Sequence, residues 1–315
     1  MTGDVELASD AVRVRCNPAH GMVITEVRDE ATGANALWTR AGFTPATISR
    51  QIGTAGAASM ESFMDIFVGG WFEMFPSAGL PGTATGALSV MHGEVVRIPW
   101  DEVERTGSRL VCETTTLRTP FGVRRTLEVS GATLRSRTDV VNLASEPVPF
   151  LWGQHPCFSR ETFRGGRIHL DVASADVPAP PFDEANSQLA CQTFDWPLAP
   201  ARDGGSSDLS RIPEVADGRH DHILLRPAAT SARITAPSIG RELVFEFGGA
   251  PHHTVLLWQD FRAPGESLDG AIDTFTLEAM NNPGRYASDA SEPGVLEGGA
   301  TMHAEVSMTW RDLGA

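Results

Sequence analysis

Two side chains of the sequence could carry a proton to or from a bound molecule. His155 stands in the stretch Trp152-Gly-Gln-His-Pro-Cys-Phe158, where Pro156 fixes the backbone after it and favours an extended conformation at the histidine. Glu278 ends an alternating apolar run directly before a turn-rich stretch. An imidazole and a carboxylate at the ends of two strands could form a general acid and base pair, with His155 as the acid.

A second set of side chains could bind a polar ligand. Trp71 and Glu73 lie between glycines, and a sugar site needs an aromatic face for the ring and carboxylates for its hydroxyls. His92 and Arg97 lie in the run 88–100, which could be an extended strand. In such a strand the two side chains point to opposite faces unless Gly93 forms a bulge.

Each of these residues also has a purely structural interpretation. His155, flanked by aromatic residues, fits a half-buried and hydrogen-bonded histidine, and Trp71 fits a core residue equally well. His92 could be a packed strand histidine. These alternatives stay open at the level of single residues.

The elements that must position these side chains are mostly strands. Regular alternation at 109–117, 123–129 and 133–141, separated by turns, predicts an antiparallel meander. Further strands are predicted at 11–15, 21–27, 222–226, 232–236, 242–247, 253–258 and 304–310. The segment 54–64 could be a short helix or an ordered loop, and 174–219 a linker or a long surface excursion. The predicted fold class is mainly β.

Composition narrows the possible partners. The formal net charge of -15 disfavours nucleic acid, because phosphate binding needs a basic surface. The chain contains no lysine, which removes Schiff-base chemistry from consideration. No apolar run is long enough to span a membrane, and no secretory signal begins the chain. The four cysteines lack metal-site spacing, so a cytoplasmic protein with free thiols is expected.

Taken together, these motifs resemble the aldose 1-epimerase (galactose mutarotase) family. The resemblance runs through most of the chain and rests on the order and spacing of several short motifs. They are Met91-His-Gly-Glu-Val-Val-Arg-Ile-Pro-Trp100, the stretch from the turn at Asn142 to Phe158, Asp221-His-Ile-Leu-Leu, Leu277-Glu-Ala-Met-Asn-Asn-Pro, and a late Leu-Glu-Gly-Gly.

The resemblance implies a single domain over 1–315, a β-supersandwich of antiparallel sheets with an open sugar cleft. It implies that His155 is the general acid and Glu278 the general base, and that His92 and Asp221 bind the substrate. A cofactor-independent enzyme is then expected, acting on a small sugar as a monomer or homodimer.

Departures from the family pattern bear on the substrate. An arginine expected near the sugar is missing from the stretch 71–79, whereas the spacing around Arg97 resembles that of the hexose-6-phosphate branch. A free hexose or an uncommon sugar is preferred. The alternatives are a non-catalytic sugar-binding or sensing protein, and a glycoside hydrolase that pairs Glu278 with Asp221 or Glu73.

Overall fold

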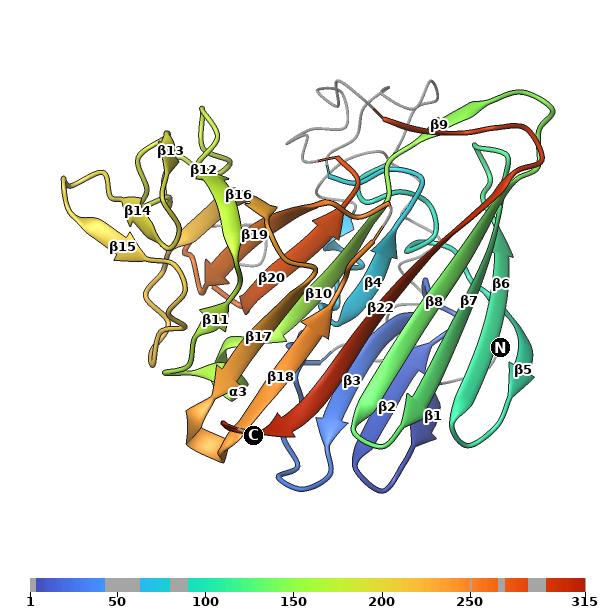
Figure 1. Cartoon of the computed structure of the whole chain (residues 1–315), viewed down its shortest axis with the longest axis horizontal. Helices are drawn as coiled ribbons and strands as arrows, with labels where there is room; N and C mark the ends of the chain where they lie inside the picture. Colours follow the sequence, from blue (N-terminus) through green and yellow to red (C-terminus); the bar gives the residue numbers. More distant parts are fainter. Residues whose placement is uncertain are drawn as a thin grey trace.

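The chain folds mainly into antiparallel strands (Figure 1). A computed structural model describes residues 4–42, 63–79, 90–249, 251–265, 270–282 and 293–314. Two large sheets pack face to face, as expected for a mainly β chain with many turn residues. Within these ranges, no helix combines the length and apolar character needed to cross a bilayer.

The first sheet has ten strands, and the strands that bear His155 and Glu278 lie at its centre. In spatial order it contains β1 (Val5–Ala8), β2 (Val12–Asn17), β3 (Val23–Asp29), β4 (Trp71–Met74), β10 (Gly153–Ser159), β20 (Asp273–Met280), β19 (Thr254–Phe261), β16 (His220–Pro227), β12 (Val172–Asp176) and β13 (Thr193–Phe194).

The second sheet has eight strands and contains the predicted meander, which is confirmed as β6, β7 and β8. Its spatial order is β11 (Ile168–His169), β17 (Ser231–Ala236), β18 (Arg241–Glu246), β22 (Thr301–Asp312), β8 (Thr133–Asn142), β7 (Phe121–Ser130), β6 (Arg109–Thr115) and β5 (Asp101–Arg105). Smaller elements are the pairs β14 (Leu198–Pro200) with β15 (Ser206–Asp208) and β9 (Val148–Phe150) with β21 (Gly294–Leu296), the helix α3 (Arg160–Phe163) and the 3-10 turn η1 (Pro237–Ile239).

Apolar side chains cover both faces of the ten-stranded sheet. Between the two sheets, Trp71 of β4 meets Phe245 of β18 with ring centroids 6.4 Å apart. On the opposite face a second apolar cluster includes Phe67, Phe72 and Trp258. All residues of β10 and β20 are therefore buried, although only alternate side chains face the main core.

Two expectations about local structure need correction or completion. Residues 91–98 form turns and bends with one isolated bridge between Gly93 and Phe75, so this part of the run 88–100 is not the extended strand considered above. The segment 174–219 carries β13, β14 and β15, and β12 pairs with β16, so this segment extends the ten-stranded sheet. The prediction for 54–64 lies outside the described residues, apart from 63 and 64.

Candidate active site

His155 and Glu278 lie side by side at the centre of the ten-stranded sheet. β10 and β20 run antiparallel with Cys157 opposite Thr276, and this register brings the two side chains together on one face. His155 Nε2 lies 3.5 Å from Glu278 Oε1. Each residue is only 3% exposed, so both side chains are largely shielded from water.

The position of His155 differs from the sequence-based expectation of a loop at a strand end. It lies inside β10, where the strand is hydrogen-bonded to β4 on one side and β20 on the other. Its ring stacks on Phe72 with centroids 4.5 Å apart, and Trp258 lies at 5.7 Å. Its Nδ1 is 3.4 Å from the Sγ of Cys157. The ring is thus held on several sides.

Burial sets the protonation of this pair. It lowers the pKa of His155 to about 3, because the charged imidazolium is poorly solvated there. Burial also raises the pKa of Glu278 to about 8, an effect that the hydrogen bond from the Thr276 hydroxyl offsets only in part. Between these values the pair carries one exchangeable proton, which the resting site holds on the carboxyl.

His92 reaches the same site from a turn. Its ring lies 5.1 Å from that of His155 and 4.8 Å from that of Phe63. His92 and Gly93 both have left-handed backbone angles, with φ of 57° and 81°. A Cβ on Gly93 would stand 2.3 Å from the carbonyl oxygen of Phe75, so only glycine permits this close approach. The pKa of His92 is lowered well below its usual range, and burial is the largest cause.

Arg97 lies close to the pocket without lining it. Its guanidinium carbon is 5.4 Å from the ring centroid of Phe63, an aromatic residue that does line the pocket. Burial lowers the pKa of Arg97 to about 10, with a smaller effect from Arg118, and the side chain stays cationic at neutral pH. Its positive charge also contributes to the lowered pKa of His92.

Trp71 and Glu73 lie on the opposite side of the sheet from His155. Trp71 donates from Nε1 to Gln154 at 2.8 Å. Glu73 accepts hydrogen bonds of 2.6 Å from Trp152 Nε1 and from the Thr138 hydroxyl. The expectation that Trp71 and Glu73 contact a sugar is therefore wrong, because alternation along β4 turns them toward the core between the sheets.

Asp221 also faces away from the pocket. Its carboxylate accepts hydrogen bonds from the Ser187 hydroxyl at 2.7 Å and from the Gln188 amide at 3.4 Å. Burial raises its pKa despite these bonds. Alternation along β16 instead directs His220 and His222 into the pocket. Asp221 therefore does not line the pocket as the sequence analysis expected, and its carboxylate instead anchors residues 187–188.

Several pocket residues were missed by the sequence analysis. His220, His222, Trp258 and Asp260 line the pocket together with His92, His155 and Glu278. The signal was present in the spacing, because His220 and His222, and likewise Trp258 and Asp260, are two residues apart and share a strand face. The remaining wall is largely apolar and includes Phe67, Phe182, Leu224, Leu256 and Ile272. Among the described residues, no three His, Cys, Asp or Glu side chains form a metal-binding group.

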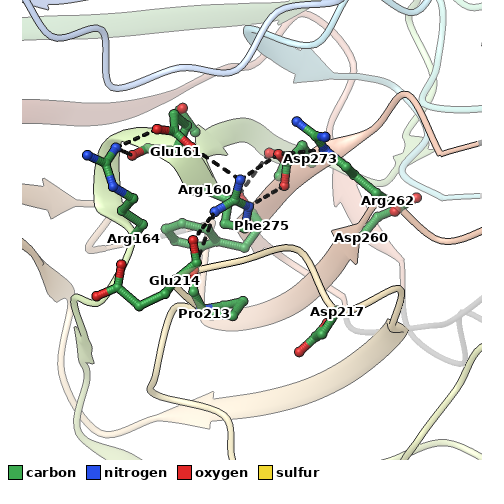
Figure 2. A network of polar contacts seen from close by, with 12 residues as sticks. Arg160, Glu161, Arg164, Pro213, Glu214, Asp217, Asp260, Arg262, Asp273 and Phe275 are labelled. Atoms are coloured by element: carbon green, nitrogen blue, oxygen red, sulfur yellow. Dashed lines mark hydrogen bonds and ion pairs between the residues drawn. The ribbon is translucent and has the colours of Figure 1, made fainter.

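A buried ion pair fastens the beginning of β20, the strand that carries Glu278. The guanidinium of Arg160 donates two hydrogen bonds to the carboxylate of Asp273, of 2.6 and 2.9 Å. Figure 2 shows this pair. The same guanidinium donates to the carbonyl of Glu214 at 3.0 Å, and Arg262 reaches Asp273 at 3.1 Å. The end of the 174–219 excursion is thereby tied to β20.

Comparison with solved structures identifies the fold. No protein-family model and no curated protein matches the sequence. A protein from Synechocystis sp. PCC 6803 superposes with a TM-score of 0.70 at 17% identity, covering 98% of this chain and 96% of its own. A galactose mutarotase-like protein from Clostridium acetobutylicum gives 0.67 at 14% identity (98% and 95% covered). A galactose mutarotase related enzyme from Lactobacillus acidophilus gives 0.64 at 14% identity (98% and 97% covered).

Proposed function

We propose that the protein is an aldose 1-epimerase, which interconverts the α and β anomers of a sugar without a cofactor. The observation that carries this proposal is the buried pair of His155 and Glu278, whose Nε2 and Oε1 atoms lie 3.5 Å apart in the largely apolar pocket. The galactose mutarotase-like fold supports it, because the chain shares that fold over nearly its whole length. His92 lines the same pocket and is proposed as a further polar contact for the sugar.

In the proposed reaction the single proton of the pair moves first from Glu278 to His155. The carboxylate then takes the proton of the anomeric hydroxyl while His155 donates its proton to the ring oxygen. The bond between C1 and the ring oxygen breaks as C1 becomes an aldehyde carbon. Rotation about the C1–C2 bond and the reverse proton transfers close the ring as the other anomer, and the pair returns to its initial state.

Glycoside hydrolysis is less well supported. That reaction uses two carboxyl groups flanking the glycosidic bond. The pairs expected from the sequence joined Glu278 to Asp221 or Glu73. Asp221 is engaged with Ser187 behind the strand, and Glu73 is engaged with Trp152 in the core. Neither can share the pocket with Glu278, and the other acid of the pocket, Asp260, lies four residues along β19 from Leu256, the residue paired with Glu278.

Polarimetry of freshly dissolved α-glucose and α-galactose tests the proposal. The wild type should accelerate anomerisation, and Glu278→Gln should reduce the rate by about 10²- to 10⁴-fold, the usual contribution of a positioned acid or base. Glu305→Gln is the matched control, because Glu305 is half exposed on β22. Full activity in folded Glu278→Gln would reject the proposal. Sugar binding without acceleration by the wild type would favour a sugar-binding protein.

A further inference from the structure

We propose that His220, oriented by Asp183, binds a hydroxyl group at the end of the sugar remote from the anomeric carbon. The inference rests on the proposed function and deepens it by naming a residue that contacts the part of the sugar far from C1. It assigns a binding role to the part of the pocket that Trp258 separates from the His155 and Glu278 pair.

Trp258 lies between the two ends of the pocket. Its ring centroid is 5.7 Å from that of His155 and 6.0 Å from that of His220, and all three residues line the pocket. An indole and a pyranose ring have similar widths. A sugar whose C1 lies beside His155, with its apolar side along Trp258, therefore presents its far hydroxyls to His220.

Asp183 fixes the orientation of the His220 ring. Its Oδ2 lies 3.1 Å from His220 Nδ1, and both side chains are buried. A carboxylate only accepts, so Nδ1 carries the hydrogen of this bond. In the neutral ring Nε2 is then the acceptor, which suits the hydrogen of a sugar hydroxyl. Asp183 is itself held by the side-chain amide of Asn186 at 2.7 Å and by the Ala185 backbone amide at 3.0 Å.

The loop that carries Asp183 is attached to β16 from both sides. Asp183 binds His220 on the pocket side of the strand, while Asp221 on the other side binds Ser187 at 2.7 Å. Phe182 of the same loop packs on the ring of His222, with centroids 4.4 Å apart. The wall is therefore preorganised for binding, which gives a single hydrogen bond more selectivity than a mobile loop would.

The residues that line the pocket favour a neutral group at the far end of the sugar. Among the described residues that line the pocket, the acids are Asp260 and Glu278, of which Glu278 rests in its neutral form, and none is an arginine. The chain has no lysine, and its cationic Arg97 packs on Phe63 without lining the pocket. A phosphate or carboxylate at the far end of the sugar would face Asp260 and the Asp183–His220 pair without a compensating cation. Hydroxyl groups are accommodated by the same acceptors.

The test combines variants with substrates that lack single hydroxyls. Anomerisation by the wild type, His220→Phe and Asp183→Asn is measured on glucose, 4-deoxyglucose and 6-deoxyglucose. His220→Phe should raise KM for glucose by about three- to tenfold, the value of one hydrogen bond, with a smaller change in kcat. On the deoxy sugar that lacks the bound hydroxyl, this rise should vanish. Asp183→Asn should show the same substrate pattern with a smaller rise.

The control is His303→Asn, because His303 is exposed on β22 of the other sheet. An equal KM rise on all three sugars, or no rise on any, would overturn the inference while leaving the proposed function intact. Absence of anomerisation by the wild type would instead count against the proposed function. Calorimetric binding of the same sugars then decides the inference, which fails if wild type and His220→Phe bind glucose equally or if the wild type binds none.

Discussion

The 3.5 Å contact between His155 Nε2 and Glu278 Oε1 is buried on both sides, so the protonation of either group depends on the other. Both groups favour their neutral forms when the site is empty. A sugar that hydrogen-bonds to the carboxylate shifts the shared proton toward His155, and this shift is what the proposed reaction needs.

The rate should depend on pH through the pair as a unit. Burial places the pKa of Glu278 at about 8 and that of His155 at about 3. Above about pH 8 the pair loses its only proton, so kcat/KM should fall there, whereas a plateau should extend well below pH 6.5. A pH profile of anomerisation checks this, corrected for the buffer-catalysed rate. A decline centred near pH 6.5 would show that His155 titrates as an ordinary histidine.

Glu278→Gln should change how stability depends on pH. The folded pKa of about 8 lies above the ordinary 4.5, so the folded state holds an extra proton between these values. The free energy of unfolding contributed by this group therefore falls as pH rises from about 4.5 to about 8. Thermal unfolding at pH 5 and pH 8.5 should show a smaller loss of Tm in the variant than in the wild type. Glu305→Gln should behave like the wild type.

Glu73→Leu should destabilise the protein through the core. Glu73 lies 3.7 Å from the fully buried guanidinium of Arg125 and accepts from Trp152 and Thr138. Removing it leaves a buried cation without its carboxylate, which costs about 3–5 kcal/mol. Urea unfolding measures the change. Glu305→Gln, which breaks an exposed pair with Arg135, should cost at most about 1 kcal/mol. Equal losses would contradict the core position of Glu73.

Gly93→Ala should be far more costly than Gly131→Ala. Both glycines have left-handed backbone conformations, with φ of 81° at Gly93 and 54° at Gly131. A Cβ on Gly131 meets nothing within 4 Å, whereas one on Gly93 would meet the Phe75 carbonyl oxygen at 2.3 Å. Gly131→Ala should lose about 1–2 kcal/mol of stability from its backbone angle alone. Gly93→Ala should lose more stability and raise KM, because His92 must move. Similar urea midpoints for the two variants would disprove this account.

The sequence predicted strand positions best where a strand has one solvent-exposed face. The alternation in β6, β7 and β8 predicted their positions because such strands show a polar side. β4 is buried on both faces, so its pattern could not tell whether Trp71 and Glu73 or Phe72 and Met74 face the pocket.

The candidate site was predictable only in part. The motifs around His155 and Glu278 led to two residues that the fold does bring together. The turn at His92 depends on the approach of Gly93 to Phe75, a contact between distant segments that local periodicity does not report. The position of Asp221 was missed because both faces of β16 carry apolar residues, with Ile223 and Leu225 on the face of Asp221 and Leu224 on the pocket face.

The central position of β10 and β20 has a consequence for hydrogen exchange. Four strands flank this pair on each side of the ten-stranded sheet. Fraying begins at sheet edges, so backbone amides within β10 and β20 should exchange with deuterium only through global unfolding, later than those of β1 and β13. The proposed proton-transfer groups would then lie on the slowest-exchanging part of the backbone.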